Sequence, residues 1–183
     1  MNLANKVTLT RIMFVPLFMI ILLIPEIPYR QYIAAGVFII AAATDGLDGY
    51  IARSRKQITR LGQFMDPLAD KLLVSAALIS LVELGKISAW IAVIIIGREF
   101  AVTGLRAILA GEGQSVAASN LGKLKTVFQI ITVVVILIDE ALSIVIPLPI
   151  SQVILYLAVI FTIWSGVDYF MKAKGILQNR LET

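Results

Sequence analysis

Long apolar segments are the feature that most limits what this chain can fold into. Hydrophobic residues make up 59% of its 183 residues and charged residues only 15%, whereas a soluble domain has about 25% charged residues. A helix needs about 20 apolar residues to cross a bilayer's hydrocarbon core. Breaks at Pro, Gly and charge clusters leave six segments near that length, which predict an all-α integral membrane protein. The predicted transmembrane helices are Thr8–Leu23, Tyr29–Arg53, Gly62–Leu84, Ile87–Leu109, Leu121–Ile138 and Ile150–Met171.

The distribution of positive charge predicts the orientation of these spans. Six spans put both termini on one side, and all 16 Lys and Arg residues except Arg30 and Lys86 fall on or near that side. Cytoplasmic loops carry an excess of Lys and Arg. We therefore expect cytoplasmic termini and a short interfacial segment before the first span.

The first span resembles a signal peptide, but Ile24-Pro25-Glu26 follows it instead of a small-residue cleavage site. We expect this helix to be retained. Because the sequence shows no internal repeat, low-complexity tract or long linker, residues 1–183 are predicted to form a single domain.

Cysteine and histidine are both absent from the chain. Their absence excludes disulfides, thiol nucleophiles, imidazole bases and zinc sites with the usual nitrogen and sulfur ligands. Any metal must therefore be held by oxygen. In so apolar a chain, the net charge of +4 indicates a basic cytoplasmic rim rather than a nucleic-acid partner.

Four aspartates stand within segments that otherwise look transmembrane. Asp45 and Asp48 have i,i+3 spacing, and Asp66 and Asp70 have i,i+4 spacing, so each pair shares one helical face. Ionisable side chains inside a membrane are expensive and usually functional. Two facing helices would bring four negative charges together, and these require protons or cations to neutralise them.

Magnesium suits such a site because it prefers oxygen ligands and is often shared with substrate phosphates, and two ions about 4 Å apart could be bridged by four carboxylates. Gly49, Ala52 and Gly62 keep the surroundings small enough for a bulky ligand to approach the backbone. The alternative to a metal site is that the aspartates cap helices or form simple ion pairs in a solvated loop. Their basic partners would then be Arg53, Arg60 and Lys71.

The string from Asp45 to Asp70 resembles the signature of the CDP-alcohol phosphotransferases, D-x2-D-G-x2-A-R-x8-G-x3-D-x3-D, at every specified position. The resemblance implies six transmembrane helices, a homodimer and a site for two Mg²⁺ or Mn²⁺ ions at the cytoplasmic face. It also implies transfer of a substituted phosphate from a CDP-linked donor to an alcohol.

The same resemblance implies a role for each matched residue. Asp45, Asp48, Asp66 and Asp70 would ligate the metals, with Asp66 and Asp70 catalytic and Asp70 the general base. The N-terminal segment with Asn5 and Thr8 is similar to the family's Asn-x2-Thr segment near the lipid phosphates, although helix capping alone also explains it. The residues implied to bind the CDP-lipid are Asn5, Thr8, Gly49, Ala52, Arg53, Thr59 and Gly62.

A second polar region predicts a site for an anionic acceptor. Arg98 and Arg106 lie in the fourth span, and Gly122-Lys123-Leu124-Lys125-Thr126 opens the fifth. The alternative to an acceptor site is that Arg98 pairs with Glu99 for structural reasons and that the lysines belong to the excess positive charge of the cytoplasmic side. The residues predicted to bind the acceptor phosphate are Arg98, Arg106, Lys123, Lys125 and Thr126.

These second motifs resemble the bacterial phosphatidylglycerophosphate synthases of the same family. This implies an inner-membrane enzyme that transfers a phosphatidyl group from CDP-diacylglycerol to glycerol-3-phosphate and releases CMP. Two alternatives stay open: another acceptor, such as inositol phosphate or serine, and an ion or solute transporter. The inverted repeats or broken midplane helices typical of many transporters are not visible in the sequence.

Overall fold

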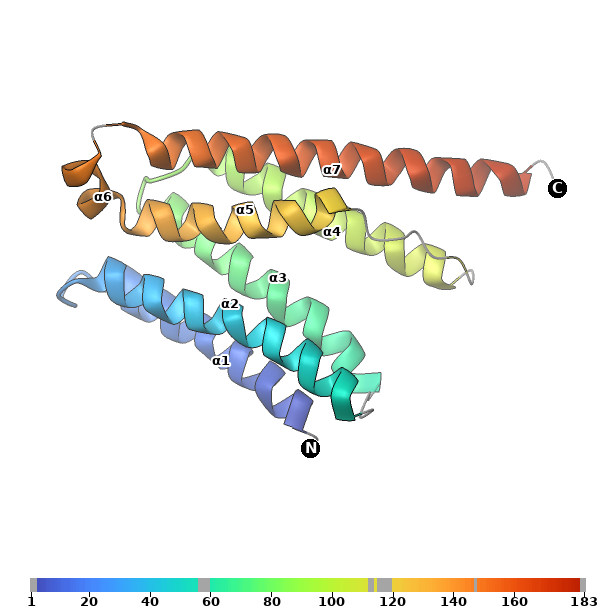
Figure 1. Cartoon of the computed structure of the whole chain (residues 1–183), viewed down its shortest axis with the longest axis horizontal. Coiled ribbons are helices and arrows are strands. Elements are labelled where there is room, and N and C mark those ends of the chain that lie inside the picture. Colours follow the sequence, from blue (N-terminus) through green and yellow to red (C-terminus); the bar gives the residue numbers. More distant parts are fainter. Residues whose placement is uncertain (1–2, 56–59, 112–113, 115–119, 147, 182–183) are drawn as a thin grey trace. The chain divides into compact units, whose positions relative to one another are not determined.

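The computed structural model describes residues 3–55, 60–111, 114, 120–146 and 148–181. Within those ranges it leaves undescribed the side chains of residues 3–8, 45–55, 60–67, 70, 120–121, 123 and 176–181. The described residues form helices and no strands, which confirms the all-α prediction (Figure 1). The helices are α1 (Leu3–Leu23), α2 (Arg30–Arg55), α3 (Arg60–Glu83), α4 (Ala89–Gly111), α5 (Asn120–Leu137), α6 (Asp139–Val145) and α7 (Ile150–Leu181).

Each of the six predicted spans coincides with one long helix, and the apolar helices are consistent with a membrane protein. Within the described residues, α7 contains a 26-residue stretch, Ile150–Gly175, with a mean hydropathy of 1.9, which is long and apolar enough to cross a bilayer. Residues Leu124–Leu137 and helix α6 form an apolar pair bent by 79°. Shorter apolar stretches occupy Leu9–Leu23 and Arg30–Thr44.

The helix boundaries differ from the predicted spans in three places. Helix α1 already begins at Leu3, so the residues expected to form an interfacial segment are its first turns. Helix α7 continues to Leu181, well beyond the predicted end at Met171. Helix α6 was not predicted, and it carries Asp139 and Glu140 in its first turn, where negative charge favours helix formation.

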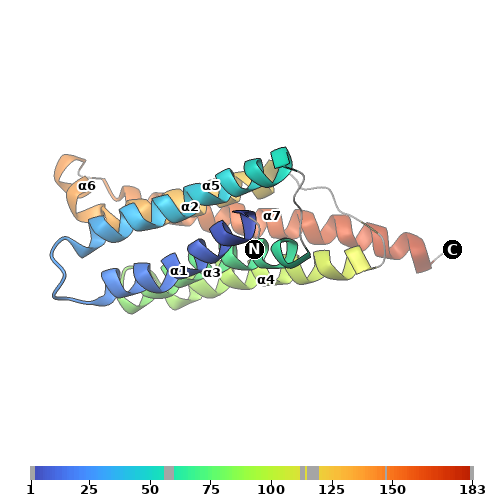
Figure 2. The ribbon, with the colours of Figure 1, turned by 90° about the horizontal axis from the view of Figure 1, so that it is seen from below.

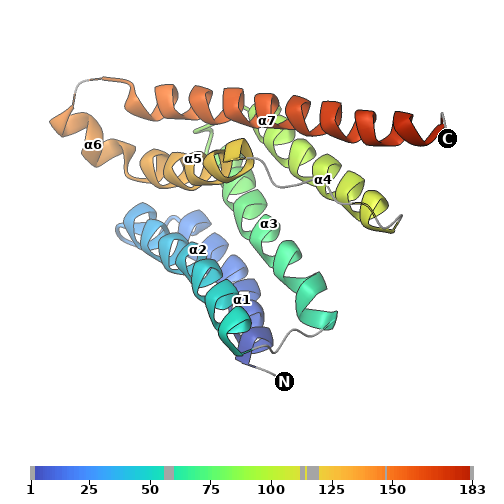
Figure 3. The same cartoon turned by 45° about the vertical axis from the view of Figure 1, so that its right-hand side comes forward.

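The chain divides into two compact units. The first comprises residues 1–88 and 133–149, and within it α1 packs against both α2 and α3. Figure 2 shows α1 running alongside α3, and Figures 1 and 3 show the end of α2 and the start of α3 at the same end of this unit as the N-terminus. Among the described side chains of α1, the buried ones are Arg11, Val15, Phe18 and Leu22, and their spacing defines a single helical face.

Aromatic and small residues hold α1 to α2 in this first unit. The rings of Phe18 and Phe38 lie 5.8 Å apart, and the buried face of α2 continues through Ala34 and Ala41. Small residues let two helices approach closely, which favours packing within a membrane. On α3 the buried face includes Leu73, Ala77, Ser80 and Leu81.

The second unit comprises residues 89–132 and 150–183, and α4 packs against α7 within it. Helix α5 also joins α7, because Gln129 Nε2 donates to Thr162 Oγ1 at 3.2 Å and the rings of Phe128 and Phe161 stack 4.8 Å apart. Thr132 Oγ1 additionally lies 3.4 Å from the Ile154 carbonyl oxygen. Polar bonds between buried helices of this kind supplement packing where lipid provides no hydrophobic drive.

Candidate active site

The four signature aspartates lie on neighbouring helices of the first unit. The backbones of Asp45 and Asp48 belong to the second half of α2, and those of Asp66 and Asp70 to the first half of α3. Their side chains lie outside the described part of the structure. The predicted CDP-lipid residue Thr59 lies outside the described chain altogether. For the other six, the backbone is described and the side chains are not: Asn5, Thr8, Gly49, Ala52, Arg53 and Gly62.

Helix geometry places the two aspartate pairs at matching heights. Helices α2 and α3 contact each other and run in opposite directions from the end where Arg55 and Arg60 lie. At 1.5 Å per residue, position 45 is about 15 Å from the end of α2 and position 70 is about 15 Å from the start of α3. Positions 48 and 66 are each about 10 Å from the same end.

The buried faces of these helices lead to the aspartate positions. On α2, Ala34, Phe38 and Ala41 are fully buried, and steps of three and four residues continue this face to positions 45 and 48. On α3, Leu73 and Ala77 are buried, and the same steps lead back to positions 70 and 66. All four positions therefore fall on faces that are packed elsewhere along the same helices.

The four aspartates also form a chemically suitable donor set for a hard divalent cation. They offer oxygen ligands only, which suits Mg²⁺ or Mn²⁺. Among the side chains that the structure describes, no three acidic residues gather into another group that could hold a metal ion.

A buried charge network in the second unit joins three helices. Arg98 Nη1 on α4 lies 3.2 Å from Glu99 Oε1, and Lys125 Nζ on α5 donates to the same carboxylate oxygen. Arg98 Nη2 donates to Ser165 Oγ on α7 at 3.0 Å. The side chains of Arg98, Glu99 and Lys125 are only 12%, 15% and 7% exposed, and both cations pair with the same Glu99 carboxylate oxygen.

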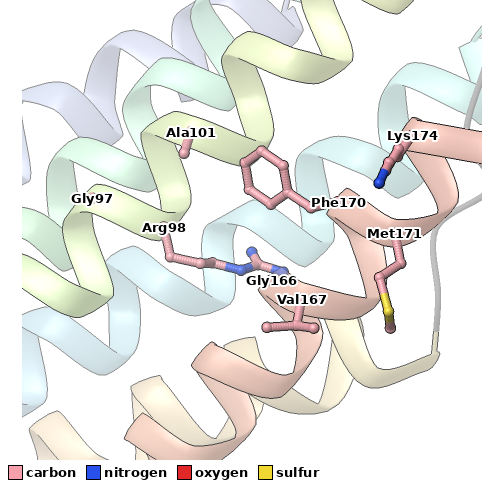
Figure 4. Close-up of a pocket in the computed structure, with 8 residues that line it drawn as sticks. All are labelled: Gly97, Arg98, Ala101, Gly166, Val167, Phe170, Met171 and Lys174. Carbon is pink, nitrogen blue, oxygen red and sulfur yellow. The ribbon is translucent and has the colours of Figure 1, made fainter. Parts of the chain in front are cut away.

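Arg98 also lines a groove of about 590 Å³ between α4 and α7 (Figure 4). Gly166 makes room for the side chain, because a Cβ atom there would lie 3.2 Å from Arg98 Cγ. Within the described residues, Arg98 Nε is buried and has no hydrogen-bond partner. The remaining walls of the groove are mostly apolar: Gly97, Ala101, Val167, Phe170 and Met171, with Lys174 at one end.

The other predicted acceptor residues are less closely gathered. Arg106 is exposed and its guanidinium lies 5.7 Å from the centre of the Tyr169 ring, about 12 Å along α4 from Arg98. Thr126 Oγ1 lies 3.3 Å from the Gly122 carbonyl oxygen, and the side chain of Lys123 lies outside the description. The structure thus joins Arg98 and Lys125 through Glu99. The pairing of Arg98 with Glu99, which the structural alternative expects, is therefore also present.

No residue of α7 is among the predicted site residues, although Ser165 bonds Arg98. Thr162, Ser165 and Tyr169 are buried on one face of α7, and Gly166 belongs to the same face. Their i, i+3, i+4 and i+7 spacing is the signal that could have indicated a helix packed against polar partners.

Paired aspartates on two adjoining helices, together with buried Arg and Lys side chains, define a class of helical membrane protein suited to phosphate chemistry. Comparison with known families makes the assignment specific, since residues 1–164 match the model of the CDP-alcohol phosphatidyltransferase family. The chain belongs to this family. The resemblance predicted from the signature is confirmed.

Similar proteins cover nearly the whole chain. A Bacillus subtilis protein named CDP-diacylglycerol–glycerol-3-phosphate 3-phosphatidyltransferase is 49% identical, covering 93% of this chain and 94% of the relative. Proteins of the same name from Haemophilus influenzae and Rickettsia typhi are 38% and 37% identical. They cover 99% and 94% of this chain and 98% and 97% of their own lengths.

Proposed function

We propose that this protein transfers the phosphatidyl group of CDP-diacylglycerol to sn-glycerol-3-phosphate, giving phosphatidylglycerophosphate and CMP. The observation that carries this proposal is the 49% identity to the Bacillus subtilis relative, whose name states this pair of substrates, over 93% of the chain. The complete aspartate signature supports the same chemistry.

The aspartates at positions 45, 48, 66 and 70 are the proposed ligands of two Mg²⁺ or Mn²⁺ ions. Bound there, the ions would neutralise charge on the diphosphate and orient it. The matching heights of the four positions on α2 and α3 support this grouping. Because the carboxylates come from two helices packed in one unit, their backbones are held in place before any ligand binds.

The transfer itself requires an in-line nucleophile and a group that takes its proton. Asp70 is the proposed base, and Asp66 holds the reacting groups beside it. The acceptor hydroxyl oxygen forms a bond to the lipid-bearing phosphorus as its proton passes to Asp70. The bond from that phosphorus to the bridging oxygen breaks, and CMP leaves with the electron pair.

The donor is proposed to lie along the ends of α1, α2 and α3 that also hold the aspartates. Its phosphates would meet the first turns of α1 and the guanidinium of Arg53, whose fork suits phosphate oxygens. Small residues on α2 and α3 leave space for the nucleotide. The proposed contacts are Asn5, Thr8, Gly49, Ala52, Arg53, Thr59 and Gly62.

The acceptor's phosphate is proposed to bind the basic residues of the second unit. Arg98 and Lys125 support this role because they are cationic, poorly solvated and held together by one carboxylate, that of Glu99. Glu99 holds both cations in place, and Ser165 fixes the second terminal nitrogen of Arg98. Arg106, Lys123 and Thr126 complete the proposed set.

We also propose a six-span protein of the bacterial inner membrane with cytoplasmic termini, acting as a homodimer and folding as a single domain over residues 1–183. The coincidence of each predicted span with a helix supports the six spans. The aspartates belong to the second half of α2 and the first half of α3, and the end of α2 and the start of α3 lie at the same end of the first unit as the N-terminus (Figure 1). Cytoplasmic glycerol-3-phosphate and CMP could reach that end.

The decisive experiment incubates purified protein with labelled CDP-diacylglycerol and a panel of acceptors, and measures CMP release. Glycerol-3-phosphate should be used far better than serine or plain glycerol, because only an anionic acceptor needs the basic set. It should also be preferred to inositol phosphate, since the Bacillus subtilis relative's name states glycerol-3-phosphate. Faster reaction with inositol phosphate or serine would refute the acceptor assignment. Absence of CMP release with every acceptor would refute the phosphatidyl transfer.

A further inference from the structure

Arg11 has no role in the chemistry described above, yet it is among the most completely buried side chains of the first unit. It is 1% exposed and lies on the apolar face of α1 with Val15, Phe18 and Leu22. A buried guanidinium is always charged and is very unfavourable unless an anion lies near it. The residues level with Arg11 on α2 and α3 therefore decide what it does.

The contact between Phe18 and Phe38 fixes the register of α1 against α2. The two helices run in opposite directions, so each step back along α1 matches an equal step forward along α2. The 5.8 Å ring contact pairs position 18 with position 38, and the same register pairs position 11 with position 45. Asp45 therefore stands at the height of Arg11.

A cavity fixes the register of α1 against α3. Leu23 and Glu83 line the same cavity of about 410 Å³, and the two helices run in the same direction (Figure 2). Counting back twelve residues along each helix pairs position 11 with position 71, adjacent to Asp70. Glu26, Glu83 and Glu140, three other acidic residues near these helices, are exposed and lie at the opposite end.

We propose that Arg11 is the fixed countercharge of the four signature aspartates. It acts as a positioning residue: its positive charge offsets part of their negative charge and lowers their affinity for metal to a level that permits exchange. This inference rests on the proposed function, because it takes these aspartates to be the metal site. Lys71 stands beside Asp70 in the chain, but its side chain is only partly buried, so water screens its charge more.

The proposal predicts opposite effects on metal binding and on stability. Without the Arg11 charge, the four acids repel one another more strongly, so the metal-free protein is less stable. The same acids attract a divalent cation more strongly, so metal binds more tightly. A merely structural arginine would lower stability equally with and without metal.

The test compares wild type, Arg11→Gln, Arg11→Lys and the matched control Arg30→Gln, which removes a cation at the opposite end of the same unit. Mn²⁺ binding is measured by electron paramagnetic resonance, and thermal unfolding is followed with Mg²⁺ and with chelator. Arg11→Gln should bind Mn²⁺ at least about tenfold more tightly and gain more in Tm from Mg²⁺ than wild type does. Arg11→Lys and Arg30→Gln should stay within about threefold of wild-type affinity.

Unchanged or weaker Mn²⁺ binding by Arg11→Gln, with wild type binding normally, would overturn the role of Arg11 alone. A wild type that binds no Mn²⁺ would overturn the metal site of the proposed function as well. If Arg11→Gln does not fold, the charge-balanced double variant Arg11→Gln/Asp45→Asn should fold. Failure of that double variant would overturn the proposal.

Discussion

At the scale of single residues, the aspartates carry the sharpest prediction. Replacing Asp45, Asp48, Asp66 or Asp70 by the isosteric Asn removes one anionic ligand without changing side-chain size. Each variant should lose at least about 100-fold in turnover while remaining folded. CMP release gives the turnover and circular dichroism the fold, with Asp139→Asn on α6 as the control. Substantial activity in chelator, or in several of the four variants, would contradict the metal mechanism.

Arg106 tests the acceptor charge without disturbing the buried network, because its side chain is exposed. Arg106→Gln should raise the KM for glycerol-3-phosphate roughly tenfold or more, since a hydrogen bond to a charged group contributes about 1.5–3 kcal/mol. The KM for CDP-diacylglycerol should change less. Lys172→Gln is the control, because it breaks an exposed ion pair with Asp168. A larger loss of CDP-diacylglycerol affinity would place Arg106 at the donor instead.

At the scale of helices, two glycines of α7 form a matched pair. A Cβ atom at Gly166 would lie 3.2 Å from Arg98 Cγ, whereas nothing lies within 4 Å of one at Gly175. Gly166→Ala must therefore displace Arg98, and overpacking of this kind destabilises by about 1–3 kcal/mol. Gly175→Ala should instead stabilise α7 by about 0.5–1 kcal/mol.

Thermal unfolding of the two variants in detergent measures the difference directly. Gly166→Ala should have the lower Tm and, because Arg98 is displaced, the higher KM for glycerol-3-phosphate. Equal Tm and KM values in the two variants would show that Arg98 does not depend on the space at Gly166.

The sequence predicted the long helices but not the contacts between them. Hydropathy and breaks in the chain are local signals, so each of the six predicted spans coincides with a helix. The bond from Arg98 to Ser165 joins residues 67 positions apart, and no local pattern indicates such a partner. Helix α6 was missed because a seven-residue helix is too short to show a periodic pattern. The aspartate roles stay predictions from the signature.

At the scale of the whole molecule, exposed apolar side chains agree with lipid as the surrounding solvent. Large hydrophobic residues are exposed on α1, α2, α4 and α7, among them Met13, Ile40, Ile108 and Trp164. On a soluble protein such extended apolar surfaces would be an aggregation hazard. Trp90, near the start of α4, is 78% exposed, and tryptophan is enriched where membranes meet water.

The orientation of the molecule can be tested with single cysteines, because the chain has none of its own. Ser54 precedes the connection between α2 and α3, at the proposed cytoplasmic end, whereas Ser88 is exposed just before α4. With six spans and cytoplasmic termini, a membrane-impermeant maleimide should label Ser88→Cys from outside spheroplasts. It should label Ser54→Cys only after the membrane is opened, and the unsubstituted protein should stay unlabelled. The reverse pattern would place the aspartates on the outer face, where glycerol-3-phosphate made in the cytoplasm could not reach them.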